Sequence, residues 1–160
     1  MNSMKRLAWL FVAGLTAGLV SCGGGSDPKP INEVKLSELS KTWELTEAKL
    51  DGTTRNDFQN VTLTISGSFN AANPLGPYNF DFIGSFPNPS PWPTNGQWSF
   101  SDDKATTLVR TSDSQVIQYA ISGNNLTLTI AGYSGAGFTG GPFTRTKAVT
   151  GTWIFSFEAQ

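Results

Sequence analysis

From residue 35 to the end of the chain, apolar side chains recur at every second position rather than every third or fourth. In one segment Val61, Leu63 and Ile65 alternate with threonines, which is the pattern of a strand with one buried face. Threonine, valine, isoleucine and aromatic residues dominate these segments, and all of them favour strands. The pattern predicts about eight strands, at residues 42–50, 61–65, 78–82, 97–101, 106–110, 116–121, 126–130 and 150–157.

Turn signals between these segments come at short intervals, so consecutive strands are expected to pair antiparallel. The clearest hairpin is residues 116–130, where Ser-Gly-Asn-Asn separates two alternating runs. A helical pattern occurs only at residues 36–39 and covers about one turn. The fold class is therefore all-β, an antiparallel meander of about eight strands, closed as a barrel or folded as a two-sheet β-sandwich. The mostly short connections favour the barrel.

The first 34 residues have a different character. Lys5 and Arg6 precede an apolar run at residues 7–20, the pattern of a signal peptide. As a helix this run would span about 21 Å, short of the hydrocarbon core of about 30 Å. After it comes a stretch rich in glycine and proline, typical of a linker. We expect a signal peptide at residues 1–21, a flexible tether at 22–34 and one β-barrel domain at 35–160.

The tetrad at residues 19–22, Leu-Val-Ser-Cys, resembles the lipobox of bacterial lipoproteins. The resemblance implies that a peptidase cuts before Cys22 after its thiol has been acylated, so that Cys22 becomes the first residue and carries the lipid anchor. Several acyl chains together hold a protein stably on a bilayer. Gly23 supplies no retention charge beside Cys22, which favours the outer membrane of the cell envelope over the inner one. The pattern leaves open whether the domain faces the periplasm or the exterior.

The helical turn at residues 36–39, the early Trp43 and the following meander together resemble the lipocalin-like (calycin) lipoproteins of Gram-negative bacteria. Lipocalins carry Gly-x-Trp in the first strand, whereas this chain has Lys41, Thr42 and Trp43, so the glycine is missing. The family also places an arginine across that tryptophan, and Arg145 is the nearest candidate. The resemblance implies a fold more than a function, because many such bacterial relatives have no assigned activity.

Composition excludes several function classes. The chain has no histidine, which removes the commonest general base and the commonest zinc ligand. Neither paired carboxylates nor a nucleophile motif appears, so we expect no enzyme, no catalytic residue, no metal and no cofactor. Beyond Lys5 and Arg6, nine basic residues stand against twelve acidic ones without forming a cluster, which argues against nucleic acid as a partner.

The candidate ligand-binding residues are aromatic: Trp43, Phe100, Trp98 and Trp153 on predicted inward faces, and Phe86 and Trp92 in a proline-rich loop at residues 84–96. The interior residues line a pocket or fill it. The loop rings clamp a ligand or, the favoured interpretation, pack onto the barrel end as a lid. Two functions follow as hypotheses: binding of a small apolar or amphipathic ligand inside the barrel, or docking of an envelope protein or glycan through the loops, with no interior ligand.

Overall fold

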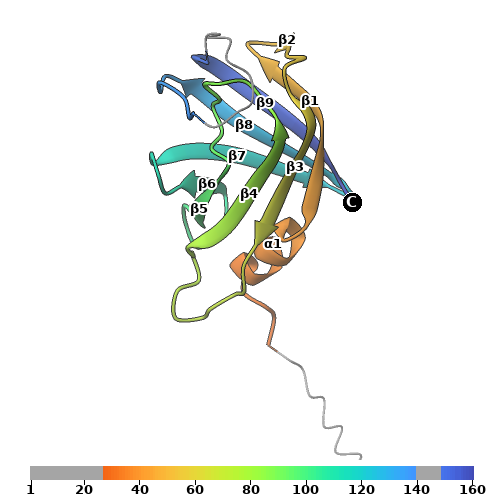
Figure 1. Ribbon diagram of the computed structural model, residues 1–160. Coiled ribbons are helices and arrows are strands. Elements are labelled where there is room, and N and C mark those ends of the chain that lie inside the picture. Colours follow the sequence, from red (N-terminus) through yellow and green to blue (C-terminus); the bar gives the residue numbers. More distant parts are fainter. Residues whose placement is uncertain (1–26, 140–148) are drawn as a thin grey trace, which may run out of the picture.

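A computed structural model describes residues 27–139 and 149–160 and shows one antiparallel sheet that follows the order of the chain (Figure 1). Each strand from β3 onward pairs with the next one along the sequence, as the meander predicted. The strands are β1 Thr42–Leu50, β2 Thr53–Thr54, β3 Gln59–Ser66, β4 Tyr78–Ser85, β5 Asn95–Phe100, β6 Thr107–Arg110, β7 Gln115–Ser122, β8 Asn125–Tyr133 and β9 Gly151–Ala159.

The sheet closes on itself because β1 also pairs with β9. The register runs from Trp43 opposite Ala159 to Leu50 opposite Trp153, with a bulge between Leu45 and Glu47. The fold is therefore a closed eight-stranded antiparallel barrel, to which the two-residue β2 adds a short extra strand on β1. The barrel of the lipocalin-like prediction is confirmed, and the alternative of a two-sheet sandwich is wrong.

All eight predicted strands are present, and two of them, β4 and β8, continue three residues beyond their predicted ends. In β4 the apolar alternation breaks at Ile83, which points outward and is 64% exposed. The backbone ladder nevertheless continues to Ser85, opposite Gln59. Gly84 permits this, because a Cβ at this position would lie 2.5 Å from the carbonyl oxygen of Asn60.

The helix α1, Ile31–Leu39, is longer than predicted and begins before the expected domain start at residue 35. Its first turn is fixed by polar contacts that an apolar pattern does not reveal. Lys29 pairs with Glu33 at 2.6 Å, and the buried side chain of Asn32 donates to the carbonyl oxygen of Asp102 at 3.2 Å. The last four residues of the predicted tether therefore belong to the folded domain.

The barrel interior is a continuous core of buried apolar side chains from every strand except β2. At one end, Leu36 and Leu39 of α1 are buried against this core, and the described chain leaves the domain from there (Figure 1). At the opposite end lies the connection between β4 and β5. The barrel thus has two different ends, one covered by a helix and the other by a loop.

The predicted signal peptide at residues 1–21, the acylated Cys22 and the candidate Arg145 lie outside the described residues. Within the described part of the chain, no helix has the length and apolar character required to cross a membrane.

Candidate functional site

All six aromatic candidates are buried, with at most 4% of any of them exposed. They do not form one site. Only Trp92 and Trp98 line the cavity at the centre of the barrel, which we call the interior cavity. Its lining consists of Leu63, Ile65, Phe80, Trp92, Trp98, Leu108, Arg110, Ile117 and Leu128.

Trp43 and Trp153 are fixed as structural residues by the hydrogen bonds of their indole rings. Trp43 Nε1 donates to the carbonyl oxygen of Leu39 at 2.9 Å, and Trp153 Nε1 donates to that of Val149 at 2.6 Å. In both cases the acceptor lies four residues earlier in the chain, so each ring secures the segment that leads into its own strand. Lys41 Nζ lies 5.3 Å from the Trp43 ring centroid, a cation over the ring.

Phe86 and Trp92 belong to residues 86–93, which we call the plug segment because both of its rings are turned into the barrel. Trp92 packs against Phe80, Phe82 and Phe155, with ring centroids 5.6, 5.7 and 5.9 Å apart. Phe86 packs against Phe82 at 5.2 Å. In this conformation the two rings form the lid on the core that the sequence favoured, and neither is presented to solvent.

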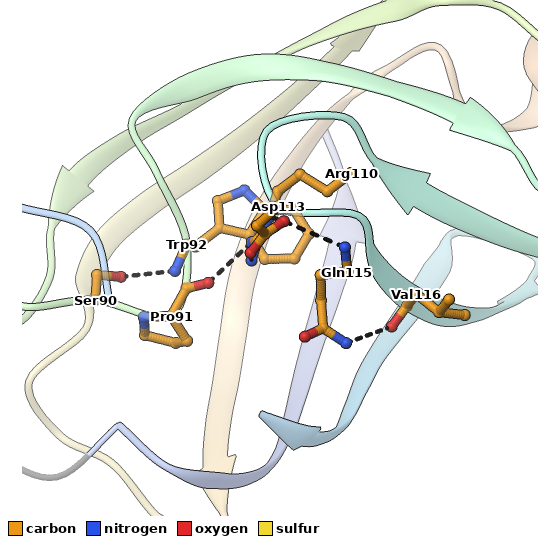
Figure 2. A network of polar contacts seen from close by, with 7 residues as sticks. All are labelled: Ser90, Pro91, Trp92, Arg110, Asp113, Gln115 and Val116. Carbon is orange, nitrogen blue, oxygen red and sulfur yellow. Dashed lines mark hydrogen bonds and ion pairs between the residues drawn. The ribbon is translucent and has the colours of Figure 1, made fainter. Parts of the chain in front are cut away.

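The plug segment is fastened to its surroundings through its backbone. Ser90 and Phe138 exchange two backbone hydrogen bonds, of 2.9 and 2.7 Å. The hydroxyl of Ser90, which is also fully buried, accepts from the backbone N–H of Trp92 at 3.1 Å (Figure 2). The bonds between Ser90 and Phe138 form an isolated antiparallel bridge, and the loop takes no part in the pairing of the barrel strands.

Arg110, at the end of β6, is a functional candidate that the sequence analysis missed. The structure buries it completely, at 0% exposure. Its Nε and Nη2 donate to Asp113 at 2.9 and 2.6 Å, and its Nη1 donates to the carbonyl oxygen of Pro91 at 2.9 Å (Figure 2). Aromatic rings of Phe138 and Trp92 lie 4.8 and 5.4 Å from the guanidinium carbon. Arg110 therefore joins the barrel wall, its counter-ion and the plug segment.

A signal for Arg110 was present in the sequence. It lies two positions after Leu108 and so shares the inward face of β6, whose burial pattern alternates accordingly. A carboxylate follows three residues later, at Asp113, where it satisfies the buried charge. A charged residue can lie in the core when it occupies an inward position of the strand and has a counter-ion nearby in the sequence.

The carboxyl of Asp113 responds to two opposing effects. Burial raises its pKa, but the hydrogen bonds and charge of Arg110, with the backbone N–H of Gln115, outweigh burial and lower the pKa below its ordinary value of 3.8. The pair is therefore an arginine cation and an aspartate anion at neutral pH, and its net charge is zero.

The interior cavity is small and apolar, and two of its lining residues, Trp92 and Trp98, carry a buried N–H group without a partner among the described residues. It measures about 10 Å³, close to the room that one water molecule needs. The indole N–H groups of Trp92 and Trp98 are both buried, and among the described residues neither finds an acceptor. A buried donor without a partner costs about 1–3 kcal/mol. Both tryptophans that line the cavity carry this cost, whereas Trp43 and Trp153 do not.

The described residues contain no group of three or more histidine, cysteine, aspartate or glutamate side chains arranged to hold a metal ion. Comparisons of the chain with models of known protein families, with curated proteins and with solved structures found no match.

Proposed function

We propose that this protein is a lipocalin-like lipoprotein of the cell envelope that binds a small, largely apolar ligand inside its barrel, in the space that Trp92 fills. The observation that carries the proposal is the origin of Trp92. This ring lies among Phe80, Phe82 and Phe155 of two barrel strands, yet it comes from a loop.

The origin matters because a side chain on a strand and a side chain in a loop depend on different backbone contacts, which must break before the side chain can leave the barrel interior. A ring on a strand leaves the interior only if strand pairing is lost on both sides. Trp92 leaves when the backbone bonds of Ser90 and one bond from Arg110 to Pro91 open. Loops are the part of a fold in which such local opening costs least. The interior is filled in this structure, and a ligand enters by exchange with the plug segment.

The unpartnered indole groups support the same conclusion. Withdrawal of Trp92 carries its N–H into water, where the lost hydrogen bonding is recovered, and this recovery offsets part of the cost of exposing the ring. Trp98 remains in the wall of the cavity, and its N–H group stays buried.

Docking of a partner through the proline-rich loop was the alternative. Its motivation was the pair of rings, Phe86 and Trp92, and both are turned inward. We therefore place the ligand hypothesis first.

Native mass spectrometry tests the proposal on the exported Cys22→Ser chain. We expect a reproducible mass excess that is lost on denaturation, either directly after gentle purification or after incubation with an extract of envelope lipids. Trp92→Ala should show more of the bound species, because no plug ring competes for the space. A bare mass for both proteins under both conditions would contradict the proposal.

Anchoring through Cys22 is a separate part of the proposal, supported by the lipobox-like tetrad and by the exit of the chain from the α1 end of the barrel. We expect the wild-type protein to fractionate with the outer membrane and to incorporate labelled palmitate. Cys22→Ser should do neither and should appear in the soluble fraction. Membrane association of Cys22→Ser equal to that of the wild type would show that the anchor lies elsewhere.

A further inference from the structure

The contacts of Arg110 restrict the chemistry of the ligand that takes the place of Trp92. In the described part of the chain, Arg110 is the charged residue that is fully buried. Two of its nitrogens are occupied by Asp113, and the third, Nη1, is occupied by the carbonyl oxygen of Pro91. Pro91 directly precedes Trp92, so the ring and the acceptor belong to the same short piece of chain.

Withdrawal of Pro91 and Trp92 therefore removes two groups from the interior at once, an oxygen acceptor and a bicyclic aromatic ring. The N–H of a charged group that is left buried without an acceptor costs more than a neutral one. A ligand that fills only the volume of the indole brings no acceptor to replace the Pro91 carbonyl oxygen at Arg110 Nη1. A ligand that also brings an acceptor atom restores the hydrogen bond.

The walls around Trp92 favour a flat ring system. Phe80 and Phe155 meet the indole at interplanar angles of 65° and 66°, and Phe82 meets it at 37°. Edge-to-face and tilted contacts of this kind are favourable for aromatic rings and are lost with a flexible aliphatic chain. The guanidinium carbon, 5.4 Å from the Trp92 ring centroid, gains a further contact with a π-face.

The charge of the site restricts the acceptor. Asp113 already neutralises Arg110, with Nη2 and the carboxylate 2.6 Å apart. A ligand with its own carboxylate would bring a second anion close to Asp113 and would lose its hydration in an otherwise apolar cavity, and both effects are unfavourable. A carbonyl oxygen accepts the same hydrogen bond without either cost.

Resting on the proposed function, we infer that the ligand class of the barrel is a neutral, flat aromatic compound of about the size of an indole, with a carbonyl oxygen that accepts a hydrogen bond from Arg110 Nη1. The ring takes the place of the Trp92 ring among the three phenylalanines. The carbonyl takes the place of that of Pro91.

Three probes of nearly equal shape test this inference by calorimetric titration of the exported Cys22→Ser chain. They are 2-acetylnaphthalene, 2-ethylnaphthalene, which lacks the oxygen, and 2-naphthoate, which carries a charge. We expect the acetyl compound to bind about tenfold more tightly than the ethyl compound, as one hydrogen bond to a charged donor implies. It should also bind more tightly than the naphthoate.

Equal affinity for the acetyl and ethyl compounds overturns the inference and leaves the proposed function standing, because the barrel then binds an aromatic ring without using Arg110. Tightest binding of the naphthoate overturns the neutral ligand class in the same way. If none of the three binds while native mass spectrometry shows a bound compound, only the inference fails. If the mass is bare as well, both fail.

Two variants test whether the probes bind at this site. Trp92→Ala should bind 2-acetylnaphthalene more tightly than the parent chain does, since the plug ring no longer competes. Arg110→Lys keeps the positive charge but not the geometry of Nη1, and it should reduce the preference for acetyl over ethyl toward unity. A Trp92→Ala chain with weaker binding than its parent contradicts replacement of the plug. If Arg110→Lys does not fold, the comparison of probes on the parent chain decides the inference alone.

Discussion

Replacement of Asp113 with alanine is expected to lower the free energy of unfolding by about 3–5 kcal/mol, the cost of leaving a buried charge without its partner. The reason is the burial of Arg110. In this ion pair the side chain of Arg110 is 1% exposed, whereas the side chain of Asp113 is 28% exposed. In the double variant Arg110→Met/Asp113→Ala, the charge that needs a partner is gone. The double variant should therefore be more stable than Asp113→Ala alone. Urea unfolding at pH 7, followed by circular dichroism, measures all three proteins.

The same pair predicts a pH dependence. The pKa of Asp113 is lower in the folded protein than the ordinary 3.8, so the carboxylate contributes stability above that value and loses it as the pH falls through the folded pKa. The stability difference between wild type and Asp113→Ala should thus narrow in acid below about pH 4. A difference that stays constant from pH 7 to pH 3 would show that the effect of Asp113→Ala does not come from its charge.

The second large effect is expected at Trp43. Trp43→Ala should cost about 3–5 kcal/mol of unfolding free energy, as truncation of a buried tryptophan does. The ring is fully buried and its Nε1 secures the end of α1 through Leu39. Trp43→Phe, which keeps most of the apolar surface and loses this hydrogen bond, should have an intermediate cost. Denaturant unfolding of the wild type, Trp43→Phe and Trp43→Ala measures the order of their free energies of unfolding.

Trp92→Ala is the matched comparison, because this ring is buried to nearly the same extent, at 4% exposure against 0% for Trp43. Its cost should be smaller by about 1–3 kcal/mol, because the substitution removes an N–H that has no acceptor among the described residues. The loop can also relax into the vacated space, which a strand cannot do. An equal or larger cost for Trp92→Ala would mean that the plug segment is as fixed as the barrel wall.

The strands were predictable because their signal is local. Alternation at Val61, Leu63 and Ile65 records which side of the sheet each residue faces, and the hairpin between β7 and β8 has its turn residues in the chain between them. The pairing of β1 with β9 has no such signal. It joins Trp43 to Ala159, which is distant in sequence, and only the number of strands and the short connections favoured closure.

The site was less predictable, because its members were identified by residue type rather than by partners. Six aromatic residues were candidates in the sequence, and the four tryptophans among them differ in whether the indole N–H finds an acceptor. Leu39 and Val149 serve Trp43 and Trp153, and these acceptors become visible only in three dimensions. Arg110 was missed because a charged residue at a strand end is usually solvated. Its position two residues after the inward-facing Leu108 nevertheless indicated that it faces the interior.

The two ends of the barrel differ in a way that gives the protein a direction. The described chain leaves beside α1, whereas the plug segment lies at the far end (Figure 1). Under the proposed anchoring at Cys22, the proposed exchange of the plug segment would occur at the end of the barrel turned away from the bilayer. Ligand exchange at that end would take place on the aqueous side and would not require release of the anchor.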